Sequence, residues 1–462
     1  MSETIADKLN QFASENEKLA ATLTAKGVPA QGGEGLVSLA EKVKRINQHV
    51  ANGMKTPVRV SSVGGILAGD FVTLTSELWP VEERKVDDGA NLIASGFAGK
   101  SRCVMAFTKG GKLYVKAVKR ETDGTIALGN SLQIAETAPA GAVLVGMTDA
   151  VAVIYPGDAG AYAAWVTLDG LTGALAYTGI ADVDAPVNLT ACALVDGLAL
   201  LCCTRQTDGK SYAMTLEFGD EAVTVGPETE LAPDFEQDEY MQAWSVAALS
   251  GRLAMVGYFR DHAVPLQYLV LAVSGDTVTQ KYAGEYLTKS ALPCVAVAAV
   301  NGNCCGVAGA AARTADSGET EALLTFEGWR VLPNERPQPM WWGEEDHSAG
   351  GSISQVSLDM MGEAHAVLSC VLDGTLYAAV VETTDHCPES GATVSLGACA
   401  GYARLWALNE NFVIGAVERA DGVYACLYRR EQAVIRAEDH NDVDGLAEAA
   451  AAAGEACMVY LA

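Results

Sequence analysis

The sequence lacks the patterns by which most metal, redox and catalytic sites are recognised. It has no CxxC pair and no HExxH segment, and its six histidines are dispersed, so neither a zinc site nor a redox dithiol is indicated. Twelve cysteines in 462 residues are too sparse for a disulfide scaffold. We expect buried free thiols, no metal, no cofactor and no catalytic residue. The chain is therefore predicted not to be an enzyme.

Long apolar runs and positive charge are also scarce. No stretch of about 20 apolar residues occurs, so no membrane span is expected, and the start MSETIADKLN lacks the pattern of a secretory signal. The net charge is −27, from 31 basic and 58 acidic residues. This excess argues against partners that carry phosphates, both nucleic acid and anionic lipid.

Residues 1–56 differ from the rest in charge and periodicity. They hold 7 basic and 6 acidic residues, a net of +1, which leaves −28 for the remainder. Apolar residues recur at alternating spacings of four and three, as in the seam of a coiled coil. The seam residues are Ile5, Leu9, Phe12, Asn16, Leu19 and Leu23. A second stripe follows between Leu36 and Val50. We expect an α-helical hairpin or coiled-coil head that oligomerises or docks to a partner; packing of both stripes on each other or on the main domain remains the alternative.

The remainder repeats a unit of short strands. An apolar strand recurs eight times, usually after a turn: CVMAF (103–107), AVAVIY (150–155), LALLCC (198–203), LAMVGY (253–258), CCGVAG (304–309), HAVLSC (365–370), FVIGAV (412–417) and ACMVYL (456–461). Seven of these are followed by an alternating strand, for example KLYVKAV (112–118) and SYAMTLEF (211–218). Such short, turn-punctuated segments indicate β-hairpins.

The period of the repeat predicts a closed ring. The segment from 57 to 462 gives about 50 residues for each of eight copies, the length of a four-stranded propeller blade. The eighth copy lacks a third strand, whereas residues 57–78 look like a third and fourth strand without a first. We therefore predict an all-β, eight-bladed β-propeller, with seven blades as the alternative. Residues 1–56 would form the head and 57–462 the propeller, closed by pairing of 446–462 with 57–82, which removes exposed sheet edges.

Two features could carry binding or chemistry. Adjacent cysteines, Cys202-Cys203 and Cys304-Cys305, occupy equivalent strands; neighbours on a strand face opposite ways and suit two separate core contacts. The second feature is an insertion predicted between the fifth and sixth blades, in which two tryptophans precede three carboxylates that could hold a sugar. These candidate ligand-binding residues are Trp341, Trp342, Glu344, Glu345 and Asp346. Wedging of both tryptophans between blades is the alternative.

The head also carries a family resemblance. The segments TIADKLN (4–10), TAKGV (24–28) and LAEKVKRI (39–46), with a glycine-rich loop before the last, resemble the N-terminal segment of tail and other virion proteins in phages and prophages of Gram-positive gut bacteria. Leu36 to Leu39 depart from that pattern, which usually has an aromatic residue and Tyr-Pro there. The resemblance implies that the head anchors the protein to a particle or trimerises it, and it transfers no catalytic residue.

Together these patterns favour a non-enzymatic phage virion component, assembled in the bacterial cytoplasm. The head would make a dimer or trimer and contact other virion proteins, while the propeller would serve display or adhesion to a host-surface glycan. The alternatives are a cytoplasmic propeller scaffold for protein–protein interaction and, third, a carbohydrate-active lyase or hydrolase with a dispersed site.

Overall fold

A computed structural model describes residues 55–461 apart from short gaps, and every regular element in that range is a β-strand. The gaps are residues 100, 158–159, 182–185, 232–240, 261–266, 286–293, 302, 315–319, 335, 348–352, 363, 384–391, 438–444 and 448–449. The predicted helical head, with the assembly residues Ile5 to Leu23, lies outside the described residues. Among the described residues no helix is long and apolar enough to cross a membrane.

The chain divides into two compact units. The first contains residues up to Glu77 together with Gly391–Val394 and Glu431–Ala462; the second contains Leu78–Ser390 and Ser395–Arg430. Two long strands, β2 (Phe71–Asp88) and β31 (Gly422–Arg436), have residues in both units.

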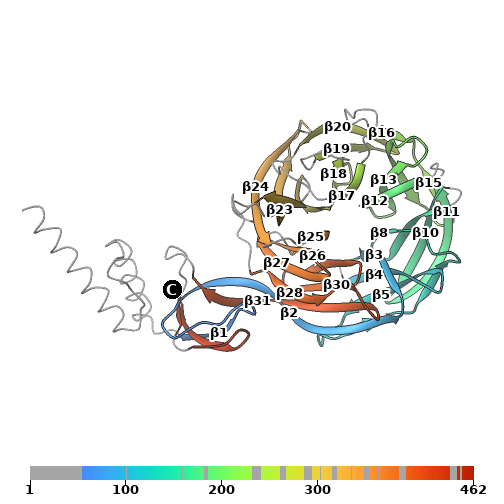
Figure 1. Ribbon diagram of the computed structural model, residues 1–462. Helices are drawn as coiled ribbons and strands as arrows, with labels where there is room; N and C mark the ends of the chain where they lie inside the picture. Colours follow the sequence, from blue (N-terminus) through green and yellow to red (C-terminus); the bar gives the residue numbers. More distant parts are fainter. Residues whose placement is uncertain are drawn as a thin grey trace, which may run out of the picture. The chain divides into compact units, whose positions relative to one another are not determined.

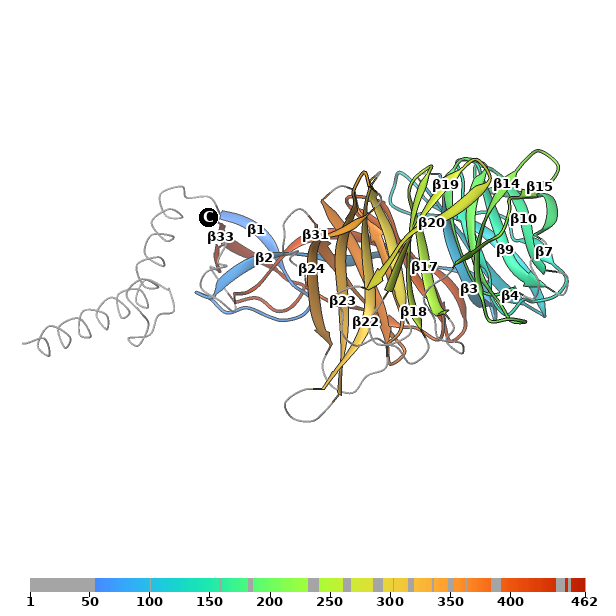
Figure 2. The ribbon, with the colours of Figure 1, turned by 90° about the horizontal axis from the view of Figure 1, so that it is seen from above.

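The second unit is built from antiparallel sheets that follow one another around a ring (Figure 1). Seen at 90°, their strands run along the axis of that ring (Figure 2). Each sheet begins with an innermost strand: β3 (Asn91–Ala98), β8 (Val143–Gly146), β12 (Pro186–Val195), β17 (Met241–Ser250), β21 (Val295–Asn301), β25 (Ile353–Met360) and β29 (Ala403–Asn409). This is the arrangement of a β-propeller.

The second and third strands of each sheet form its buried middle. The second strands are β4 (Arg102–Lys109), β9 (Ala150–Gly157), β13 (Leu198–Arg205), β18 (Leu253–Arg260), β22 (Cys304–Thr314), β26 (His365–Leu372) and β30 (Phe412–Arg419). The third strands are β5 (Lys112–Arg120), β10 (Gly160–Asp169), β14 (Ser211–Phe218), β19 (Gln267–Ser274), β23 (Thr320–Val331), β27 (Thr375–Glu382) and β31. All seven predicted pairs of an apolar strand and an alternating strand are hairpins in the structure.

The turns of these hairpins explain part of the glycine content. Between β4 and β5 the chain reverses at Gly110 and Gly111, with φ of 57° and 77°. Two successive residues with positive φ are what a type I′ hairpin turn requires. Between β26 and β27 the same turn is made by Asp373 and Gly374, with φ of 48° and 72°, because aspartate tolerates the left-handed region better than most residues.

The outer edge varies from sheet to sheet. Its strands are β6 (Ile126–Leu128) and β7 (Leu132–Ala135), β11 (Thr172–Ala181), β15 (Val223–Val225) and β16 (Thr229–Leu231), β20 (Thr277–Glu285), β24 (Pro337–His347) and β28 (Val394–Ala398). The sheet of β29, β30 and β31 has no outer strand from its own stretch of sequence; instead β31 pairs with β2, which precedes β3 in the chain. Strands from the two ends of the second unit thus share one sheet.

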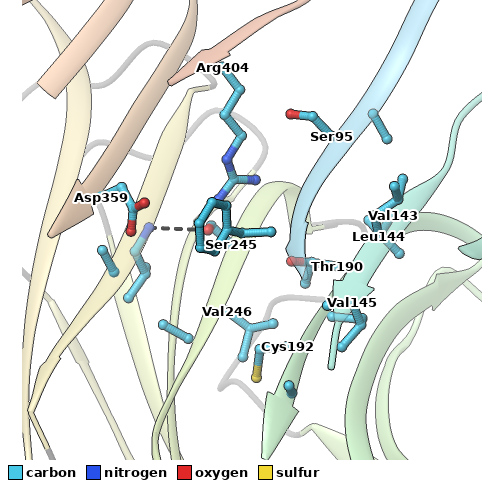
Figure 3. A pocket seen from close by; sticks show the side chains of 18 of the residues that line it. Ser95, Val143, Leu144, Val145, Thr190, Cys192, Ser245, Val246, Asp359 and Arg404 are labelled. Atoms are coloured by element: carbon cyan, nitrogen blue, oxygen red, sulfur yellow. Dashed lines mark hydrogen bonds between the residues drawn. The ribbon is translucent and has the colours of Figure 1, made fainter. Parts of the chain in front are cut away.

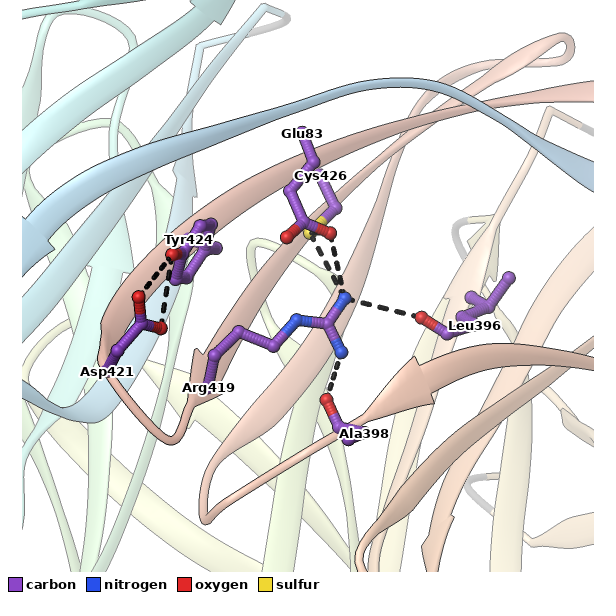
Figure 4. A network of polar contacts seen from close by, with 7 residues as sticks. All are labelled: Glu83, Leu396, Ala398, Arg419, Asp421, Tyr424 and Cys426. Carbon is purple, nitrogen blue, oxygen red and sulfur yellow. Dashed lines mark hydrogen bonds and ion pairs between the residues drawn. The ribbon is translucent and has the colours of Figure 1, made fainter.

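A polar cluster fixes β2 in this last sheet (Figure 4). The guanidinium of Arg419 on β30 donates to Glu83 Oε2 on β2 at 2.9 Å and to the carbonyl oxygens of Leu396, at 3.3 Å, and Ala398. The Arg419 side chain is only 15% exposed, whereas that of Glu83 is 46% exposed. The bonds connect β2 with β28 and β30.

The first unit has a small core of its own. In it β1 (Lys55–Val60) pairs antiparallel with β33 (Ala456–Leu461) and parallel with β31, while β32 (Gly445–Ala447) pairs with both β33 and β2. The strands enclose buried apolar side chains: Val58, Val60, Ile66, Val72, Val434, Ala447, Cys457 and Val459.

This unit contains the strand that the repeat pattern predicts as the eighth apolar copy. Residues 446–462 and 57–82 supply strands that pair with each other, but ACMVYL (456–461) is not the second strand of an eighth four-stranded sheet. As β33 it lies between β1 and β32 around a separate core. The described residues form seven sheets in all. The eighth apolar strand was misassigned because burial makes strands of two different sheets look alike in sequence.

Candidate functional site

The seven innermost strands of the second unit surround one cavity of about 400 Å³. Every inner strand contributes to its lining, from Ser95 on β3 to Arg404 on β29. Most of the lining is small and apolar, as alanine and valine on β8, β12, β17 and β21 illustrate. Polar atoms nevertheless make up most of the surface exposed in the cavity. Its volume lies within the range of roughly 300–1,000 Å³ that is typical of small-molecule pockets.

The lining contains two charged side chains, Asp359 on β25 and Arg404 on β29. Figure 3 shows the Arg404 side chain extending into the cavity, with Asp359 and Ser95 on different sides of it. The guanidinium carbon of Arg404 lies 4.0 Å from the ring centroid of Trp406. Residues 404 and 406 are two apart on one strand and therefore face the same side, so the sequence itself places the cation on the indole.

The indole of Trp406 is held in place by the neighbouring sheet. Its Nε1 donates to Ser95 Oγ at 2.9 Å, and the hydroxyl of Tyr402 lies 3.2 Å from the same Ser95 oxygen. Ser95 is buried. The rings of Trp406 on β29 and of Tyr402 just before it are thereby fixed against β3, so the indole under Arg404 is held by a hydrogen bond.

Asp359 belongs to a row of side chains that satisfy the open edge of β29. Gln355 Oε1, Ser357 Oγ and Asp359 Oδ2 accept hydrogen bonds from the backbone N–H groups of residues 403, 405 and 407, at 2.8, 3.4 and 2.8 Å. Acceptors on alternate residues of β25 thus meet donors on alternate residues of β29. These hydrogen bonds supply acceptors to the backbone N–H groups at the edge of β29. A buried N–H group without an acceptor would destabilise the fold.

Burial raises the pKa of Asp359 to about 6, against the opposing effect of its hydrogen bonds and of Arg404. Desolvation disfavours the ionised carboxylate. Asp359 Oδ1 also accepts from the N–H of Met360 at 3.0 Å. Both carboxylate oxygens therefore serve the backbone, and no ion pair within 4.0 Å joins Asp359 to Arg404 among the described residues.

The guanidinium of Arg404 is not fully hydrogen-bonded. Its Nε is buried and has no hydrogen-bond partner among the described residues. A buried donor without an acceptor costs about 1–3 kcal/mol. The cavity thus holds a guanidinium that is stacked and oriented but not neutralised by a direct partner.

The predicted sugar-binding segment has a different setting from the one expected. Residues 337–347 form β24, whose residues 341, 342, 344, 345 and 346 pair with residues 328, 327, 325, 324 and 323 of β23. Trp341, Trp342, Glu344, Glu345 and Asp346 therefore lie on a regular strand of the fifth sheet, not on an inserted loop.

The adjacent cysteines behave as strand alternation predicts. Cys203 packs in the core between the sheets of β9 and β13, whereas Cys202 packs in the core on the other side of β13. All described cysteines are free thiols. Burial raises the pKa of Cys203 to about 12 and that of Cys202 well above its usual value, so neither forms the reactive thiolate.

Sequence reasoning missed Arg404, Trp406 and Asp359. The signal was present in ARLWAL (403–408), where an arginine interrupts an inner strand whose counterparts, such as VAVAAV (295–300), are small and apolar. The repeat is recognised by its second and third strands, and the inner strands do not enter that pattern.

No group of three potential metal ligands occurs among the described residues.

Comparisons with known proteins give a distant likeness in fold. No protein-family model matches the chain, and no curated protein matches it. Among solved structures, a protein from Lactobacillus plantarum has a TM-score of 0.47 at 14% identity, covering 71% of this chain and 92% of its own. The WD40 domain of coronin from Toxoplasma gondii has a TM-score of 0.44 at 10% identity, covering 81% and 90%.

Proposed function

We propose that the protein is a non-enzymatic virion component of a phage, in which a propeller is displayed by an N-terminal assembly segment. The observation that carries the proposal is the pairing of the first and last described strands in the first unit. There β1, which directly follows residues 1–54, pairs with β33. The residues of the second unit, Leu78–Ser390 and Ser395–Arg430, lie between these two strands in the sequence.

This organisation suits an anchor joined to a displayed module. The heptad stripe of residues 5–23 and the resemblance of residues 4–46 to phage virion proteins supply the assembly function. The displayed module is a propeller for which we propose seven blades, one for each inner strand that lines the central cavity. The last blade is completed by β2, so strands from both ends of the unit hold the ring closed.

The cavity favours binding over hydrolysis. Glycoside hydrolases need two carboxyl groups, one as acid and one as base or nucleophile. The lining offers one, Asp359, and both of its oxygens are engaged by backbone N–H groups. This supports a role in display or adhesion, in contact with other virion proteins and a host-surface glycan.

Light scattering tests the assembly part of the proposal. The full chain is compared with a chain that begins at Lys55, where the described strands begin. We expect a dimer or trimer for the full chain and a monomer for the shortened one. A monomer in both cases would contradict the assembly role and favour the alternative of an intracellular propeller scaffold.

A further inference from the structure

The central cavity has the chemistry of a binding site that does not depend on a virion role. Its one cation, Arg404, lies on the Trp406 indole, and Trp406 is tied to Ser95. A guanidinium on an aromatic face keeps its N–H edge free, and that edge matches the two oxygens of a carboxylate. The buried Nε of Arg404 lacks an acceptor among the described residues, so the guanidinium is not held by an internal hydrogen bond at that atom.

The surroundings of Arg404 add hydroxyl groups and aromatic faces. Ser95, Thr190 and Ser245 line the cavity from three different inner strands, and the rings of Trp244 and Trp406 line it as well. The hydroxyl of Thr190 makes no hydrogen bond among the described residues. Ser245 Oγ accepts the N–H of residue 297 at 3.1 Å and retains its own proton to donate.

We propose that this cavity binds a sugar acid, a small carboxylate that carries several hydroxyl groups. Its carboxylate would pair with the guanidinium of Arg404, its hydroxyls would meet the serine and threonine side chains, and its C–H face would pack on the indoles. The volume of about 400 Å³ accommodates one monosaccharide unit and lies within the usual range for such pockets.

The charge of Asp359 affects the affinity of the cavity for an anionic ligand. Asp359 lines the same cavity and, when ionised, repels an anionic ligand. Replacement by asparagine removes the charge and retains one acceptor oxygen, which can serve one of the two N–H groups of residues 360 and 407. The variant D359N should therefore bind a sugar acid more tightly than the unchanged protein.

Isothermal titration calorimetry with the full chain tests the proposal. The probes are D-glucuronate, methyl β-D-glucuronide as a mimic of a glycan-terminal residue, and uncharged D-glucose. We expect at least about tenfold weaker binding of glucose than of glucuronate, since hydrogen bonds to a charged group contribute about 1.5–3 kcal/mol. Binding of the methyl glycoside identifies a glycan end as the source of the ligand; binding of the free acid alone identifies the monosaccharide.

Two arginine variants give the test its control. R404Q should lose about tenfold or more in glucuronate affinity, and R404K should also lose affinity because an ammonium cannot form the two-point contact. R120Q is the matched control: the Arg120 guanidinium lies 3.6 Å from the ring centroid of Phe412 and its Nε is also buried without a partner among the described residues, but Arg120 does not line the cavity.

Three results would overturn the proposal. They are absence of glucuronate binding at millimolar concentrations, equal binding of glucose and glucuronate, and an equal loss in R120Q and R404Q. If R404Q does not fold, the comparison of glucuronate with glucose and the effects of R404K and D359N still decide. Failure here would leave the assembly role intact, since that role concerns residues 1–54.

Discussion

At the scale of single residues, the Asp359 carboxylate accepts hydrogen bonds from two backbone N–H groups at the ring of inner strands. Its first role is structural, because it satisfies two backbone donors, one of them on the neighbouring sheet. Burial holds its pKa near 6, above the value of about 3.9 in an unfolded chain. The folded protein therefore binds this proton more tightly than the unfolded chain does.

This difference predicts a pH-dependent effect of D359N. Between pH 4 and pH 6 the folded state holds more protons at Asp359 than the unfolded state, so the contribution of Asp359 to stability falls as the pH rises. The asparagine variant has no such slope. Relative to the unchanged protein, D359N should gain about 2–3 kcal/mol between pH 4 and pH 7. Urea denaturation at the two pH values measures it; a constant difference between the two proteins would refute the assignment.

Gly146 gives a second prediction at this scale. A Cβ on this residue of β8 would lie 1.5 Å from the carbonyl oxygen of Phe97 on β3, closer than any two such atoms can approach. G146A should therefore force adjacent inner strands apart and lower the free energy of unfolding by at least about 3 kcal/mol.

A nearby glycine supplies the control for G146A. A Cβ on Gly141 would meet no other atom within 4 Å, and its backbone is not in the left-handed region. G141A should change the stability by no more than about 0.5 kcal/mol. Equal effects of the two substitutions, measured by thermal or urea denaturation, would show that β3 and β8 do not approach as closely as described.

At the scale of strands and sheets, the sequence predicts the repeated hairpins but not the partners of the last strand, β33. Seven hairpins such as β13–β14 follow from apolar runs that alternate with turn residues, since each run is buried between neighbouring sheets. Strand β33 has the same composition, but its partners β1 and β32 belong to another core. The local sequence pattern shows that a strand is buried, but it does not show which strands lie beside it. The sequence therefore could not show that ACMVYL pairs with β1 and β32.

The cavity residues were missed for a related reason. Arg404 and Asp359 are 45 positions apart, and the inner strands that carry them read as ordinary runs of small residues. Both line one cavity only because the sheets of β25 and β29 follow one another around the ring, which the sequence does not show. The arginine in ARLWAL is visible in the sequence, but its neighbour in the cavity is not. The tryptophans at 341 and 342 stand out in the sequence, although their segment forms a regular outer strand.

The joint between β2 and the last sheet yields a prediction at the scale of elements. Arg419 connects Glu83 with the carbonyl groups of Leu396 and Ala398. R419M retains the aliphatic stem but leaves these acceptors without a donor, and it should cost about 2 kcal/mol in urea denaturation. The control is K85M, which removes the exposed pair of Lys85 with Asp421 and should leave the midpoint unchanged. An equal loss of stability in both variants would mean that the Arg419 hydrogen bonds stabilise β2 no more than an exposed ion pair does.

At the scale of the whole molecule, a predicted assembly segment precedes a described pair of units. The described part of residues 55–461 forms two units, one with a small core of its own and one with a ring of sheets around a cavity. The assembly function rests on the heptad seam of residues 5–23 and on its resemblance to phage virion proteins. Charge agrees with this division, since the propeller carries nearly all of the negative excess while the head is close to neutral.

The most direct test of the assembly role is sedimentation velocity on the full chain with single changes in the predicted seam. Leu9 and Leu19 occupy the seam, whereas Ala21 falls on the opposite face of the predicted helix. We expect a dimer or trimer for the unchanged protein and for A21D, and a monomer for L9D and L19D. An oligomer that survives both leucine substitutions, or a monomer in every case, would contradict an assembly role for the N-terminal segment.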